Sequence, residues 1–148
     1  MKQLFFTIFL SFLSVAFVNA SNYEFTISDE NELYSYNRCA SLFSVIANTA
    51  RAQEADEMAE LYDTMTKSIW TKSADRYEEL KNVNRKDAIS WSEKNILRLQ
   101  DNYLDYINEL NEGDSFFSES MELDKEHCIG IFGKIEAEKY NSGEELLN

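Results

Sequence analysis

Apolar residues recur along the chain at intervals of three and four, the spacing of one face of an α-helix. A first helix is predicted from Ser28 or Asp29 to about residue 51, and a second over residues 54–70. A break near Ser73 would keep Arg76 out of the second apolar stripe. The first stripe is Tyr36, Cys39, Phe43, Ile46 and Ala50, and the second is Met58, Leu61, Tyr62, Met65 and Ile69.

The same spacing predicts a third helix from about Asp87, capped by Gly113, and a fourth over residues 118–140. Four segments of about 30 Å each predict an all-α fold over residues 29–140, an antiparallel four-helix-type bundle. The chain has no proline and four glycines, which favours long helices. Alternating apolar residues predict an extended strap over residues 21–28, and residues 141–148 are expected to be a flexible tail.

The N-terminus has the pattern of a secretory signal. Lys2 is the only charged side chain before Glu24, and the intervening apolar run ends at the small residues Val18-Asn19-Ala20. This pattern predicts a signal peptide over residues 1–20 that is cleaved after Ala20. The run is too short to cross a bilayer, which needs about 20 apolar residues, so no stable membrane anchor is expected. The mature protein is predicted to be secreted or periplasmic.

The two cysteines, Cys39 and Cys128, lie on the stripes of the first and last predicted helices. In an oxidising compartment such a pair forms one disulfide, and up-down-up-down topology makes these two helices neighbours. The alternative is two buried free thiols that act as small apolar groups. Asp124 lies one turn before Cys128 near the inward face, where a charge needs a partner. The available partners are Arg38, next to Cys39, and Arg76. We predict a buried ion pair between Asp124 and Arg38, beside the disulfide.

Acidic residues outnumber basic ones by 27 to 14, which gives a formal charge of −13. Such a charge repels nucleic acid and attracts cationic proteins or peptides. On the third predicted helix, Leu97 and Leu104 form a second apolar line, which is either core-facing or a surface for a partner. The residues proposed for that surface are Trp91, Leu97, Leu104, Asp101 and Asp105.

No catalytic, cofactor or metal motif is present, and His127 is the single histidine of the chain. A metal site would need further ligands of nitrogen or sulfur type, and catalysis needs convergent polar groups. We therefore expect no enzyme activity, cofactor or metal. The predicted function is binding by an exported acidic helical bundle, with a basic protein or peptide as partner. The alternative is a carrier that holds a small apolar or aromatic ligand between its helices.

Two short stretches carry a resemblance to other proteins. They are Arg38-Cys39-Ala40 and the pattern Met121-x-x-Asp124-x-x-x-Cys128. With these stretches the chain resembles a group of small, uncharacterised secreted helical proteins of bacteria that contain two cysteines. The resemblance implies a helical fold and the disulfide. It implies no activity, cofactor or catalytic residue.

Overall fold

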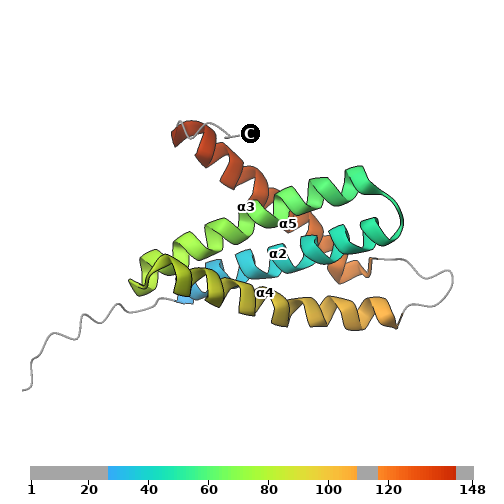
Figure 1. Cartoon of the computed structure of the whole chain (residues 1–148), viewed down its shortest axis with the longest axis horizontal. Helices are drawn as coiled ribbons and strands as arrows, with labels where there is room; N and C mark the ends of the chain where they lie inside the picture. Colours follow the sequence, from blue (N-terminus) through green and yellow to red (C-terminus); the bar gives the residue numbers. More distant parts are fainter. Residues whose placement is uncertain (1–26, 110–116, 143–148) are drawn as a thin grey trace, which may run out of the picture.

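The computed structural model describes residues 27–109 and 117–142. Within these ranges the protein is a bundle of four α-helices without strands, which confirms the predicted all-α fold (Figure 1). The helices are α2 (Ile27–Ala52), α3 (Asp56–Lys81), α4 (Arg85–Asn108) and α5 (Glu119–Ser142). None of these helices is long and apolar enough to cross a membrane. The predicted signal peptide, the strap up to residue 26, the Gly113 cap and tail residues 143–148 lie outside the described residues.

Two short connections hold the first three helices of the bundle antiparallel. Residues 53–55 join α2 to α3, and residues 82–84 join α3 to α4. Asn82 ends α3 in the left-handed region with φ of 49°, a conformation that asparagine tolerates better than most residues. Asn84 then begins α4, because its side-chain oxygen accepts a hydrogen bond from the Asp87 backbone N–H at 3.0 Å. Connections this short leave neighbouring helices no arrangement but a hairpin.

Helix α2 is the centre of the fold and contacts all three other helices. Residues 39–43 of α2 are each at most 1 % exposed. Because five consecutive residues cover every side of a helix, α2 is surrounded by protein over this stretch. Helix α5 crosses α2 and α3 obliquely (Figure 1). The predicted disulfide between Cys39 and Cys128 is present, with a Cα–Cα distance of 5.2 Å, and joins α2 to α5. The first and last helices are therefore neighbours, as predicted.

A buried polar cluster joins α2, α3 and α4, and it was not anticipated from the sequence. The Asn37 side-chain oxygen accepts hydrogen bonds from the hydroxyls of Ser73, at 2.8 Å, and Ser92, at 3.1 Å. Ser41 donates to the backbone oxygen of Ile96 at 2.9 Å. The side chains of this cluster are almost completely buried. The predicted break near Ser73 is wrong, because this serine is a core residue of a continuous α3.

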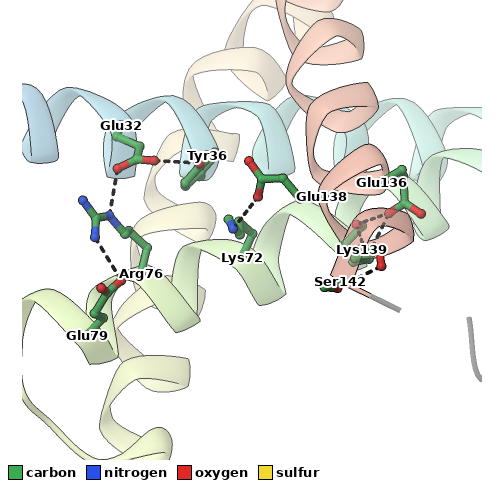
Figure 2. A network of polar contacts seen from close by, with 10 residues as sticks. Glu32, Tyr36, Lys72, Arg76, Glu79, Glu136, Glu138, Lys139 and Ser142 are labelled. Atoms are coloured by element: carbon green, nitrogen blue, oxygen red, sulfur yellow. Dashed lines mark hydrogen bonds and ion pairs between the residues drawn. The ribbon is translucent and has the colours of Figure 1, made fainter. Parts of the chain in front are cut away.

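Arg76 does not enter the core as α3 continues past Ser73. Its guanidinium donates to Glu32 of α2 at 2.8 Å and to Glu79 one turn further along α3 at 2.9 Å (Figure 2). It also donates to Asp29 of α2 at 2.9 Å. The side chain is 27 % exposed, so the charge is paired and partly solvated. Arg76 therefore avoids the cost of a buried unpaired charge, and α3 needs no break to prevent it.

Helix α3 packs only part of its predicted stripe against the core. Ile69 is buried and Tyr62 and Met65 pack against the core as predicted, whereas Met58 and Leu61 are each 52 % exposed. Ala59 and Ser73, which are smaller or more polar, are buried although they lie outside the predicted stripe. Small side chains let α3 lie close to α2, and a stripe chosen by hydrophobicity alone misses them.

Candidate functional site

Residues of α3 and α4 line an apolar groove of about 360 Å³. Its lining residues are Thr66, Trp70, Glu93, Ile96 and Leu97. Leu97 is 62 % exposed, although the residue before it, Ile96, is buried in the core. Exposed apolar side chains beside an apolar hollow are typical of binding surfaces rather than of solvated helix faces.

The exposed face of α4 continues the groove towards the C-terminal end of the helix. Leu104 lies seven residues after Leu97, which at about 100° per residue brings it back to within roughly 20° of the same face. Leu104 is exposed, and so are Asp101 and Asp105 beside it. We call the groove together with Asp101, Leu104 and Asp105 the Leu97 surface. The sequence placed Leu97 and Leu104 on one line, but it did not predict Trp70 as part of the same surface.

Trp91 does not belong to this surface, contrary to the grouping made from the sequence. It lies six residues before Leu97, which places the two side chains roughly 120° apart around α4. The Trp91 ring stacks on Tyr77 of α3, with ring centroids 3.9 Å apart and planes at 7°. Trp91 therefore helps to fix α4 against α3, and the stack explains why it lies off the apolar stripe.

The indole N–H of Trp70 is buried, and it has no hydrogen-bond partner in the part of the chain that the structure describes. A buried donor without an acceptor costs about 1–3 kcal/mol. The sequence contained no sign of this, because a tryptophan at helical spacing is ordinarily core filling. The indole ring of Trp70 lines the groove, while its N–H is buried and has no partner among the described residues.

The structure also brings Arg38 and Asp124 together, next to the disulfide. The Arg38 Nη2 and Nε atoms lie 2.6 and 3.1 Å from Asp124 Oδ2. The Tyr103 hydroxyl accepts a hydrogen bond from Arg38 Nε at 3.2 Å and donates to the same carboxylate oxygen at 3.0 Å. The expectation of a buried pair needs correction, because the Arg38 side chain is 40 % and the Asp124 side chain 19 % exposed. Arg38 keeps partial contact with water, which lowers the cost of its charge.

The electrostatics of this cluster follow from its contacts. Burial raises the pKa of the Tyr103 hydroxyl to about 12, so it is protonated at neutral pH. Burial disfavours the charge on Arg38, but hydrogen bonds to Asp124 and Tyr103 outweigh that effect and raise its pKa. The cluster therefore presents a permanent guanidinium, and Tyr103 stays neutral.

The comparisons with known proteins give no relative from which a role could be transferred: the chain matches no family model, no curated protein and no solved structure. Within the described residues, no group of three or more histidine, cysteine, aspartate or glutamate side chains could hold a metal ion. Among the described residues, the Leu97 surface combines exposed apolar side chains with an apolar groove.

Proposed function

We propose that this protein is a binding module whose Leu97 surface captures a basic, amphipathic segment of another protein. The observation that carries the proposal is the apolar groove beside the exposed Leu97, with the acidic side chain of Glu93 in its lining. An apolar side chain of the partner would fill the groove against Trp70 and Leu97, and burial of a leucine-sized group is worth about 1.5–3 kcal/mol. Specificity would come from that anchor.

Charge supports a cationic partner. Glu93 lines the groove, and Asp101 and Asp105 lie exposed along the same helix. The chain as a whole carries a formal charge of −13, so a basic segment is attracted from a distance and an acidic one is repelled. Helical segments with apolar residues at intervals of three and four fit such a groove, and their lysine and arginine side chains would reach the flanking acids.

A fluorescence titration tests the proposal, because the chain has only two tryptophans and one of them lines the groove. Trp91→Phe preserves an aromatic ring against Tyr77 and leaves Trp70 as the only indole. The titrant is a cationic amphipathic helical peptide of lysine and leucine, and the control peptide is a scrambled one of equal charge. The amphipathic peptide should shift Trp70 emission with saturation at an ionic strength of about 0.15 M, where long-range attraction is screened.

Leu97→Ser should weaken this binding at least tenfold, since it removes an apolar wall of the groove. Leu123→Ser on α5 is the matched control, because Leu123 is 63 % exposed and Leu97 is 62 % exposed. If both variants bind like the parent, or if the scrambled peptide binds equally well, attraction is by charge alone and the proposal fails.

A further inference from the structure

A second hollow borders the Arg38–Asp124 pair, between α2, α4 and the start of α5. It is separate from the Leu97 surface. Its volume is about 260 Å³. We call it the Arg38 cleft. The ion pair lines it together with the buried residues Leu99 and Met121 and the rings of Tyr34 and Tyr106. The polar side chains of Asn102, Ser118 and Ser120 complete the lining with Tyr103. Tyr34 is exposed although it is large and aromatic, which leaves its ring available at the cleft.

The ion pair has unused hydrogen-bonding capacity. All three hydrogen bonds to Asp124 in the described part of the chain end on Oδ2, so Oδ1 has no partner there. On Arg38, Nε and Nη2 are engaged, whereas Nη1 makes no hydrogen bond with a described residue. Arg38 and Asp124 both line the cleft, and each keeps one atom, a cationic donor and an anionic acceptor, that bonds to no described residue. Tyr103 bonds to both partners and so holds them in fixed relation.

A ligand that matches this ion pair must carry both charges. A carboxylate would accept from Arg38 Nη1, and an ammonium group would donate to Asp124 Oδ1. An anion alone would leave the Asp124 carboxylate facing it, and a cation alone would leave the Arg38 guanidinium facing it. A zwitterion is also neutral overall, so the formal charge of −13 neither attracts nor repels it strongly.

The lining residues other than the ion pair determine which side chain the ligand can carry. Leu99, Met121 and the tyrosine rings favour an apolar or aromatic side chain on the ligand, and Asn102, Ser118 and Ser120 offer polar contacts around it. The volume of about 260 Å³ lies just below the range of roughly 300–1,000 Å³ that is usual for drug-sized ligands, which limits the ligand to a small molecule. We propose that the Arg38 cleft binds a free α-amino acid with an apolar side chain, held through both of its charged groups.

Isothermal titration calorimetry of the intact protein tests this inference with L-phenylalanine and L-leucine as probes. Two truncated probes separate the charges: phenylpropionate lacks the ammonium group, and phenethylamine lacks the carboxylate. At least one amino acid should bind saturably, and at least tenfold more tightly than either truncated compound, because each lost contact is a charge-assisted hydrogen bond. The proposal is overturned if neither amino acid binds, or if a truncated probe binds as tightly.

Variants locate the site. Asp124→Asn keeps the shape of the side chain but removes the negative charge, and it should lower amino-acid affinity at least tenfold. Tyr34→Ala should also weaken binding, and it remains informative if Asp124→Asn loses its helical circular dichroism, because Tyr34 is exposed and contributes little to the core. Tyr140→Ala is the matched control, an exposed tyrosine that does not line the cleft. Equal affinity in Tyr34→Ala and Tyr140→Ala would place binding elsewhere and refute the assignment.

Discussion

The buried cluster around Asn37 makes a quantitative prediction about stability. Replacing Asn37 by leucine keeps a side chain of similar size but removes the oxygen that accepts from Ser73 and Ser92. Both hydroxyls are fully buried, and a buried donor without a partner costs about 1–3 kcal/mol. A serine in a helix can turn its hydroxyl to a backbone carbonyl of the preceding turn, so the low end of that range applies. The free energy of unfolding should fall by about 2–3 kcal/mol.

The same reasoning predicts a rescue. In the triple variant Asn37→Leu/Ser73→Ala/Ser92→Ala no polar side chain of the cluster is left without a partner. Replacing both sides of a buried hydrogen bond by apolar groups can be nearly neutral, so the triple variant should recover most of the lost stability. Ser92→Ala alone removes one donor and should cost only about 1 kcal/mol.

Urea denaturation followed by far-ultraviolet circular dichroism, with the disulfide intact, measures these differences. With a urea dependence of about 1–3 kcal/mol/M, a change of 2–3 kcal/mol shifts the midpoint by roughly 0.7–3 M. If Asn37→Leu alone is as stable as the parent, the cluster contributes nothing to stability. If the triple variant is no more stable than Asn37→Leu, the loss comes from misfit of the leucine and the hydrogen-bond argument is refuted.

Other parts of the structure give further expected outcomes. Replacing Cys39 and Cys128 together by serine removes a cross-link between positions 89 residues apart; the free energy of unfolding should fall by about 2–4 kcal/mol, and reductant should then no longer affect the melting temperature. The pKa of Tyr103 is about 12 in the folded protein and about 10 in an unfolded chain, so the stability that its protonated form supplies is complete below pH 10 and is lost between pH 10 and 12. Tyr103→Phe should reduce that loss in denaturation series across this pH range, and an unchanged profile would contradict the assignment. Gly130→Ala and Gly133→Ala should each raise the free energy of unfolding by about 0.5–1 kcal/mol, because the added Cβ has no atom within 4 Å and alanine favours the helix; a destabilised variant would show an unrecognised contact.

The fold was predictable from sequence because its determinants are local and repetitive. The spacing of apolar residues predicts the helices, and the lack of proline indicates that they are long. The disulfide followed from two cysteines on inward stripes of the first and last helices, combined with bundle topology. The pairing of Arg38 with Asp124 followed from the cost of an isolated charge near the core. These inferences need only helix periodicity and one topological assumption.

The errors arose where a polar or small residue lies in the core. The break near Ser73 is predicted in order to keep Arg76 out of the apolar stripe, and no pattern in a single chain shows that Ser73 meets Asn37 across a helix interface. Met58 and Leu61 were placed inside because they are the more hydrophobic choice, whereas close packing of α3 on α2 uses Ala59. Trp91 was grouped with Leu97 because both lie off the main stripe, and its stacking on Tyr77 depends on how two helices cross. Each error concerns contacts between helices, which periodicity within one helix does not encode.

The two proposed sites differ in how far they depend on α5, and this gives a way to separate them. The Leu97 surface is built from α3 and α4, which are held to α2 by short connections and by the Asn37 cluster. The Arg38 cleft needs Asp124 of α5 to lie against Arg38 of α2, and the disulfide fixes these two helices together one turn away. Reduction of the disulfide loosens that attachment but leaves the α3–α4 interface intact. Reductant should therefore weaken amino-acid binding in the Arg38 cleft and spare peptide binding in the groove, provided that circular dichroism shows the helices retained. Equal sensitivity of both would mean that α5 supports the whole bundle, and equal resistance would mean that Asp124 is positioned without the disulfide.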